Sequence, residues 1–237
     1  MKKKIILKSS ILAVAAGLSV FAINSVFADE LPVQFMGVND FHGALEQTGT
    51  ARLEGETVKN AGTAPLLATY LNDSQKDFET ENAGTPNASI RVQAGDMVGA
   101  SPANSALLQD EPTVKVFNEM NFEYGTLGNH EFDEGLGEFN RIMKGEAPTP
   151  GQFNKIVDEY PHEASKQEVV IANLVDKDTN KIPFDWKPYT IKEIPVNDKT
   201  VKVGFIGVVT TEFPNLVLRK NHEQYRVLDE AESIAKY

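Results

Sequence analysis

The chain has 237 residues, of which 41% are hydrophobic, so it is long enough to bury the core of one sizeable domain. It contains no cysteine, which excludes a disulfide framework and a cysteine-ligated zinc site and leaves Asp, His, Asn, Glu or backbone oxygen to hold any metal. The formal net charge of −11 disfavours binding to nucleic-acid polymers and anionic membranes, although a bound divalent metal can still attract a small anion locally.

The first 28 residues resemble a secretory signal peptide. Lysines occupy positions 2–4, an apolar run extends from Ile11 to Phe27, and Val26-Phe27-Ala28 fits a signal-peptidase site. The run is nearly long enough for a membrane anchor, but the cleavage site and the acidic pair at 29–30 favour removal. Removal takes away four lysines and no acidic residue, so the net charge changes from −11 to about −15. We therefore expect a secreted or cell-surface protein without stable membrane insertion, whose domain begins at residue 29.

The rest of the chain alternates between expected strands and helices. Strands are predicted at 33–38, 90–94, 122–127 and 169–172, a hairpin at 189–194 and 201–209, and helices at 62–71, 112–120, 136–143 and from 229 onward. Thr63 is expected to cap the first helix, with Pro65 in its first turn. Residues 73–88 and 144–167 are predicted to be surface loops. Alternating strands and helices predict an α/β fold.

Three polar clusters follow predicted strands: Asp40-Phe41-His42, Gly95-Asp96, and Gly-Asn-His-Glu-Phe-Asp at 128–133. In α/β sheets, functional groups gather at the carboxyl ends of strands, so the clusters are expected to meet. Together they offer carboxylates, imidazoles and an amide oxygen, which are suitable ligands for a pair of divalent metals. Two such ions can polarise a phosphoryl group and activate a water for in-line attack.

The order of the clusters suggests a division of the metal ligands. Asp96 is the expected bridge between two ions, because its cluster lies between the other two. Asp40 and His42 would hold one ion, since alternate residues of an extended strand end point to the same side. The side-chain oxygen of Asn129 would hold the other.

His130 is expected to act on the substrate rather than on the metals. It would stabilise phosphoryl charge and protonate the leaving oxygen. Asp133 would hold the His130 ring and keep it cationic. Asp133 has an alternative explanation as the N-cap of the helix that follows it.

Each cluster taken alone also has a purely structural explanation. The Asp-x-His pattern arises by chance, and Gly-Asp or Asn-His often forms a turn. Three clusters in this order, each after a strand, favour a site. His162 and His222 follow no such junction, and we expect both to be surface residues.

The motifs at 39–43 (NDFHG), 93–96 (QAGD) and 126–133 (TLGNHEFD) resemble the secreted bacterial 5′-nucleotidase and 2′,3′-cyclic-nucleotide 2′-phosphodiesterase family of the calcineurin-like metallophosphoesterases. The resemblance covers essentially all of the chain after residue 28. It implies a four-layer α-β-β-α sandwich with a dinuclear metal site. The implied site residues are Asp40, His42, Asp96 and Asn129 as metal ligands, with His130 and Asp133 as a catalytic pair.

The chain departs from the family pattern after residue 133. The family completes its site with further histidines, including a Gly-His-x-His motif, and carries a C-terminal domain that grips the nucleoside base between aromatic residues; neither is matched here. We therefore expect 29–237 to be the N-terminal part of a longer enzyme, ending inside a helix and inactive alone.

The expected activity is hydrolysis of extracellular nucleotides, which are small-molecule substrates, with two divalent metal ions, zinc or manganese. The alternatives are a phosphoesterase for another ester, such as a sugar phosphate or a cyclic phosphodiester, and a non-catalytic metal-binding surface module.

Overall fold

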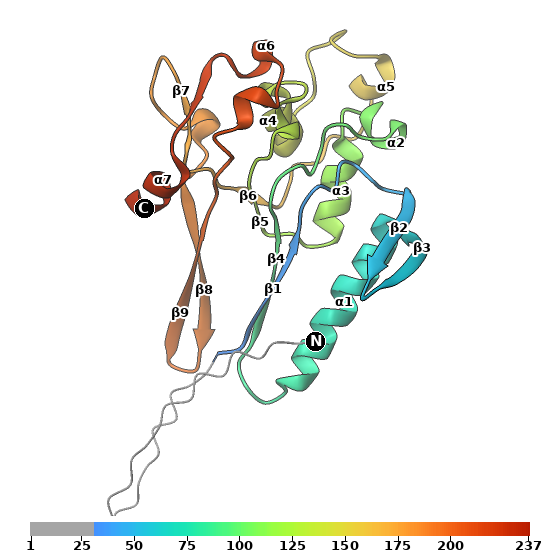
Figure 1. Ribbon diagram of the computed structural model, residues 1–237, viewed down its shortest axis with the longest axis vertical. Helices are drawn as coiled ribbons and strands as arrows, with labels where there is room; N and C mark the ends of the chain where they lie inside the picture. Colours follow the sequence, from blue (N-terminus) through green and yellow to red (C-terminus); the bar gives the residue numbers. More distant parts are fainter. Residues whose placement is uncertain (1–30) are drawn as a thin grey trace, which may run out of the picture. The chain divides into compact units, whose positions relative to one another are not determined.

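A parallel sheet forms the centre of the computed structural model, which describes residues 31–237 (Figure 1). The predicted signal peptide, residues 1–28, lies outside the described residues. The strand order is β1-β4-β5-β6, formed by β1 (Val33–Val38), β4 (Ala88–Gln93), β5 (Tyr124–Gly125) and β6 (Glu168–Val169). The first two strands confirm the prediction, whereas β5 and β6 are shorter than expected. The β5 ladder ends at Gly125, and just beyond it the Gln93 side chain donates to the carbonyl of Thr126 (2.9 Å).

Helices pack on one face of this sheet. They are α1 (Ala64–Glu81), the short α2 (Ala103–Ala106), α3 (Glu111–Glu119) and α4 (Leu136–Lys144). Figure 1 shows α1 and α3 alongside the sheet, and Leu71, Val114 and Phe139 share one buried cluster with Met36 of β1.

The first helix is longer than its sequence suggests. Thr63 caps it as expected, with Oγ1 accepting from the N–H of Leu66, but it continues to Glu81 through residues predicted to be a loop. The cause lies in the sheet. The guanidinium of Arg91 on β4 donates to Asn72 (2.8 Å) and Gln75 (2.9 Å), which gives this polar stretch a tertiary partner.

An antiparallel hairpin covers part of the other sheet face. It consists of β8 (Tyr189–Val196) and β9 (Lys199–Ile206), joined by a turn at 197–198, and confirms the predicted hairpin. Ile194 packs with Ile90 of β4, and the Phe205 ring stacks on Tyr124 with centroids 4.3 Å apart. The described residues thus form helical, parallel-sheet and antiparallel layers, and the α/β prediction is confirmed.

Several short elements have no clear sequence signal. They are the exposed hairpin β2 (Thr48–Leu53) and β3 (Glu56–Gly62), the pair β7 (Leu174–Asp176) and β10 (Tyr225–Val227), α5 (Lys155–Asp158), α6 (Arg219–His222), and the 3-10 turns η1 (His130–Phe132), η2 (Pro183–Asp185) and η3 (Phe213–Asn215). The last helix, α7 (Glu230–Lys236), begins where predicted and is capped by Asp229. Between residues 31 and 237, no helix combines the length and apolar character needed to span a bilayer.

The prediction that His162 is a surface residue is wrong, whereas His222 keeps a partly exposed position. Loop 144–167 folds back onto α3 and α4, so that the His162 ring, 13% exposed, bonds the buried carboxylate of Glu111 (2.6 Å). His222 is half-buried with its ring against Phe213. Both histidines have partners distant in sequence, which local context does not reveal.

Candidate metal and catalytic site

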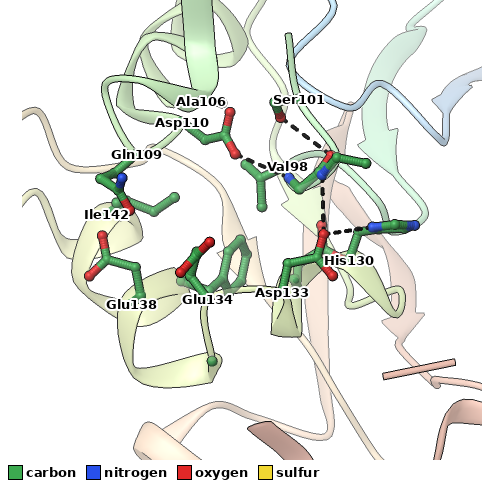
Figure 2. Close-up of a pocket in the computed structure, with 15 residues that line it drawn as sticks. Val98, Ser101, Ala106, Gln109, Asp110, His130, Asp133, Glu134, Glu138 and Ile142 are labelled. Atoms are coloured by element: carbon green, nitrogen blue, oxygen red, sulfur yellow. Dashed lines mark hydrogen bonds and ion pairs between the residues drawn. The ribbon is translucent and has the colours of Figure 1, made fainter. Parts of the chain in front are cut away.

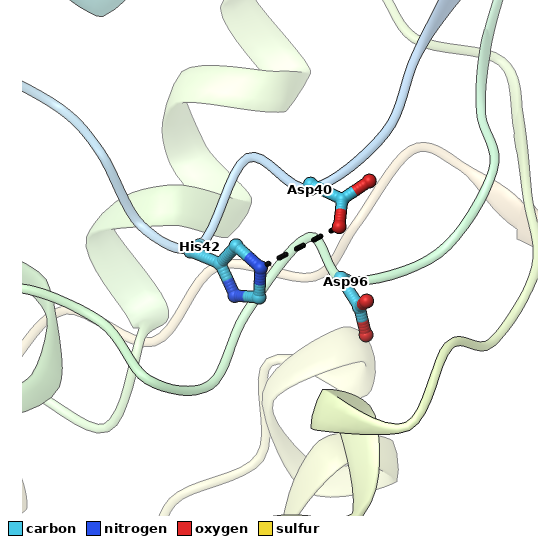
Figure 3. A group of neighbouring side chains, drawn as sticks. All are labelled: Asp40, His42 and Asp96. Carbon is cyan, nitrogen blue, oxygen red and sulfur yellow. Dashed lines mark ion pairs between the residues drawn. The ribbon is translucent and has the colours of Figure 1, made fainter. Parts of the chain in front are cut away.

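The loop after β1 runs along the loop after β4. The backbone N–H groups of Asp40 and His42 donate to the carbonyls of Gly95 (3.2 Å) and Asp96 (3.0 Å). This pairing brings the side chains of Asp40, His42 and Asp96 together, with one ligand atom from each lying within 4.8 Å of the others (Figure 3). Two of the three predicted clusters therefore meet at the carboxyl ends of neighbouring strands.

The backbone at these residues is not extended. Asp40, His42 and Asp96 have φ values of 53°, 48° and 54°, in the left-handed region that Asp and His tolerate better than most residues. Asp40 and His42 do converge as predicted, but the predicted cause, alternation along an extended strand end, is wrong. They converge because the chain turns, and such conformations are concentrated at functional sites.

A backbone carbonyl orients the His42 ring. Nδ1 lies 2.9 Å from the carbonyl oxygen of Gly99, which can only accept, so Nδ1 carries the proton. In the neutral ring, Nε2 is then unprotonated, and it lies 3.8 Å from Oδ1 of Asp40 (Figure 3). The unprotonated Nε2 of His42 thus faces the carboxylates of the cluster with its lone pair free, which a histidine metal ligand requires.

The loop after β5 adds His130 to this cluster. The N–H of His130 donates to Oδ1 of Asp96 (2.9 Å), and its ring meets that of His42 edge-on with centroids 4.7 Å apart. Nδ1 lies 2.8 Å from Oδ2 of Asp133. Burial lowers the pKa of His130. The hydrogen bond and charge of Asp133, together with the charges of Asp96 and Glu131, raise the pKa by more than burial lowers it, so the pKa lies above its ordinary value of 6.5.

The alternative role of Asp133 as a helix cap is wrong. Gly135 occupies the N-cap of α4, and the Asp133 carboxylate is directed instead to His130 and to the N–H of Ala100 (3.1 Å). The predicted pairing of Asp133 with His130 is present in the structure.

Asn129 is half-buried and immediately precedes His130. Its neighbour Gly128 explains how the loop comes so close to Asp96, because a Cβ added to Gly128 would lie 2.3 Å from Oδ1 of Asp96. The role of Asn129 as a ligand stays a prediction.

Sequence reasoning missed the part played by Glu131. Its carboxylate is 2% exposed and accepts from three backbone N–H groups, those of Gly128 (2.6 Å), Asp96 (3.0 Å) and Met97 (2.8 Å). Burial raises the pKa of Glu131 to about 7, against the opposing effect of these donors. The sequence did offer one signal: Glu131 directly precedes the apolar Phe132, which makes burial of its carboxylate plausible from the sequence. A buried carboxylate needs hydrogen-bond partners, so such a residue can join neighbouring loops.

A pocket adjoins His130 on the side of Asp133 (Figure 2). Its lining includes the carboxylates of Asp110, Asp133, Glu134 and Glu138. Such a wall of carboxylates disfavours binding of an anion in this pocket.

Comparisons with known proteins agree with the motifs. No family model matches the chain. It is 53% identical over 211 residues to the cell wall protein Lmo0130 of Listeria monocytogenes, covering 89% of this chain and 26% of that protein. It is 35% identical to the endonuclease YhcR of Bacillus subtilis (88% of this chain, 16% of that protein) and 32% identical to the 2′,3′-cyclic-nucleotide 2′-phosphodiesterase/3′-nucleotidase of Salmonella typhimurium (51% and 17%).

Solved structures have the same fold. The NAD nucleotidase NadN of Haemophilus influenzae matches with a TM-score of 0.59 at 23% identity (84% of this chain, 30% of that chain), and a putative 5′-nucleotidase of Staphylococcus aureus with 0.57 at 23% (86% and 34%). The calcineurin-like phosphoesterase YfkN of Bacillus subtilis matches with 0.56 at 24% (85% and 55%). The chain is thus similar to proteins of the 5′-nucleotidase and cyclic-nucleotide phosphodiesterase family. The metallophosphoesterase fold expected from the motifs is confirmed. The chain spans about a quarter or less of the length of these three curated relatives.

Proposed function

We propose that this 5′-nucleotidase-family protein is a metal-dependent phosphoesterase that hydrolyses extracellular nucleotides. One observation carries the proposal: ligand atoms of Asp40, His42 and Asp96 lie within 4.8 Å of one another, with the His130 ring beside them. Metal ligands and a candidate acid–base group thus face the same point, which is the arrangement that phosphate ester hydrolysis requires.

The residues present fit divalent metal ions. Two carboxylates and an imidazole suit zinc or manganese, and we propose two ions, with Asn129 as a fourth ligand and Asp96 shared between them. When bound, such ions polarise a phosphoryl group and lower the pKa of a water. The chain's own part is to supply negative charge at fixed positions. The Asp96 carboxylate accepts from the N–H of His130, while the backbone of Asp96 accepts from the N–H of His42 and donates to Glu131.

We assign His130 as the general acid. Asp133 accepts from Nδ1 and fixes the ring, which leaves Nε2 to face the substrate. The raised pKa of His130 keeps a proton available for the departing oxygen near neutral pH. Donation from Nε2 to the leaving oxygen would leave a neutral ring still held by Asp133.

Mononucleotides are the proposed substrates, acted on outside the cell or at its surface. The signal-peptide-like segment supports this location, as does similarity to a protein named for the cell wall. A relative is named an endonuclease, but the acidic balance of this chain opposes binding of a polyanion. Nucleoside monophosphates are therefore expected to be hydrolysed faster than single- or double-stranded DNA at physiological salt.

The test is metal removal from the protein at its natural length. Exhaustive chelation should abolish turnover of a nucleoside monophosphate, and manganese or zinc should restore it. Asp96→Asn should lose both metal and activity, whereas Asp178→Asn, a change at an exposed carboxylate after β7, should keep both. Turnover that survives chelation would refute the metal-dependent mechanism. Metal binding without turnover of any phosphate ester would favour a surface module instead.

A further inference from the structure

One tight turn, Gly99-Ala100, connects the candidate metal ligand to the candidate acid. The carbonyl of Gly99 accepts from Nδ1 of His42 (2.9 Å), and the N–H of Ala100 donates to the Asp133 carboxylate that also holds His130. The orientation of both imidazoles therefore depends on where this turn lies.

Asp110 anchors the turn from a second direction (Figure 2). Its Oδ2 accepts from the N–H of Gly99 (3.1 Å), while its Oδ1 accepts from the hydroxyl of Ser105 (2.6 Å). Ser105 in turn shares a hydrogen bond with Thr113 (2.8 Å), and both of these residues are fully buried. The Asp110 carboxylate is thus fixed by the interior of the protein before it reaches Gly99.

The turn has no room to move toward the catalytic loop. Gly99 has φ +79°, and a Cβ added there would lie 2.5 Å from the carbonyl oxygen of His130 and 2.8 Å from Oδ2 of Asp133. Packing limits the turn on the His130 side, and two hydrogen bonds fix the peptide units that flank Gly99: Asp110 accepts from the N–H of Gly99, and Asp133 accepts from the N–H of Ala100.

We infer that Asp110 is a positioning residue for His42. It holds the Val98–Gly99 peptide unit through the N–H of Gly99, while Asp133 holds the next unit through the N–H of Ala100. Fixing Gly99 from this side keeps its carbonyl aimed at Nδ1 of His42, which keeps the proton there and leaves Nε2 as the metal-binding atom. The inference rests on the proposed metal function. Partners of this kind, one step removed from a metal ligand, typically change metal affinity 10- to 100-fold.

Two substitutions separate this role from simple packing. Asp110 has φ 59°, so Asp110→Gly removes the carboxylate without backbone strain. Asp110→Asn tolerates the same φ and can still accept from Gly99 through its amide oxygen while its NH₂ donates to Ser105. Glu134→Ala serves as the control, because it removes another carboxylate of the same pocket.

Manganese affinity is measured by titration calorimetry for each purified protein. We expect Asp110→Gly to weaken binding about 10- to 100-fold. Asp110→Asn should stay within about threefold of the wild type, and Glu134→Ala should match it. Unchanged affinity in Asp110→Gly overturns the inference, as does an equal loss in Asp110→Asn. If the wild type binds no metal, the proposed function fails instead.

A metal-free measurement gives an independent readout. In long-range ¹H–¹⁵N spectra at a pH where the ring is neutral, His42 should be the Nδ1–H tautomer in the wild type and in Asp110→Asn. Asp110→Gly should show a substantial Nε2–H population. A lower melting temperature for Asp110→Gly with an unchanged His42 tautomer would mean that Asp110 has only a structural role, and would overturn the inference.

Discussion

The carboxylate of Glu131 accepts a hydrogen bond from the backbone N–H of Asp96, with 3.0 Å between oxygen and nitrogen. The same carboxylate bonds Met97 and Gly128, so one side chain joins the loop after β4 to the loop after β5. The metal ligands proposed on these loops, Asp96 and Asn129, therefore depend on a buried residue outside the proposed ligand set.

Glu131→Gln should weaken this connection. The new amide NH₂ would face backbone N–H groups that need acceptors, and leaving a buried donor unsatisfied costs about 1–3 kcal/mol in the free energy of unfolding. Urea denaturation of the metal-free protein measures this loss. Glu134→Gln, at an exposed neighbouring position, should change the free energy of unfolding by less than about 0.5 kcal/mol. Equal stability of the two variants would show that the connection contributes nothing.

Gly128→Ala should distort the site through a steric clash with Asp96. The added Cβ would lie 2.3 Å from Oδ1 of Asp96, so the carboxylate or the loop must move. We expect a loss of about 1–3 kcal/mol in stability and weaker metal binding, measured by denaturation and calorimetry. Gly137→Ala in α4 is the matched control, because its Cβ would enter open space. Replacing this helical glycine should stabilise the protein by about 0.5–1 kcal/mol.

His130→Ala separates acid–base catalysis from metal binding. Metal content, measured by elemental analysis, should stay near that of the wild type, while turnover of a nucleotide falls roughly 100- to 10,000-fold. The loss should be smaller for 4-nitrophenyl phosphate, because its leaving group scarcely needs protonation. A His130→Ala protein that loses its metal would identify His130 as a ligand and contradict the assignment.

Asp133→Asn should lower the pKa of His130. Burial disfavours the imidazolium and lowers the pKa of His130, whereas the hydrogen bond and charge of Asp133 raise it. Removing the charge of Asp133 weakens the raising effect, so the pKa falls. At pH values between the two pKa values, the wild-type ring is charged and the variant ring is neutral. An NMR titration of the metal-free protein measures both. Asp178→Asn should leave the His130 titration unchanged, and an unaltered pKa in Asp133→Asn would mean that the 2.8 Å contact has no electrostatic effect.

The sequence revealed those parts of the site that are local in the chain. The three motifs and the pairing of His130 with Asp133 are short-range patterns, and the structure brings the three motifs together as expected. The parts that were missed have partners far along the chain. Glu131 bonds the loop of Asp96, the second half of α1 is stabilised by Arg91, and His162 bonds Glu111 across 51 residues. The left-handed turn at Asp40 and His42 was also invisible, because a strand end and a turn begin with the same residues.

The long separations across the site affect how the protein folds and acquires metal. The bond from His42 to Gly99 spans 57 residues, and that from His130 to Asp96 spans 34. Neither can form until the parallel strands have paired, and parallel pairing of distant segments is slow. An unfolded chain therefore has no preformed site, and ion capture follows chain collapse. Excess manganese should accordingly leave the refolding rate nearly unchanged and slow unfolding, because the stabilisation is gained after the transition state.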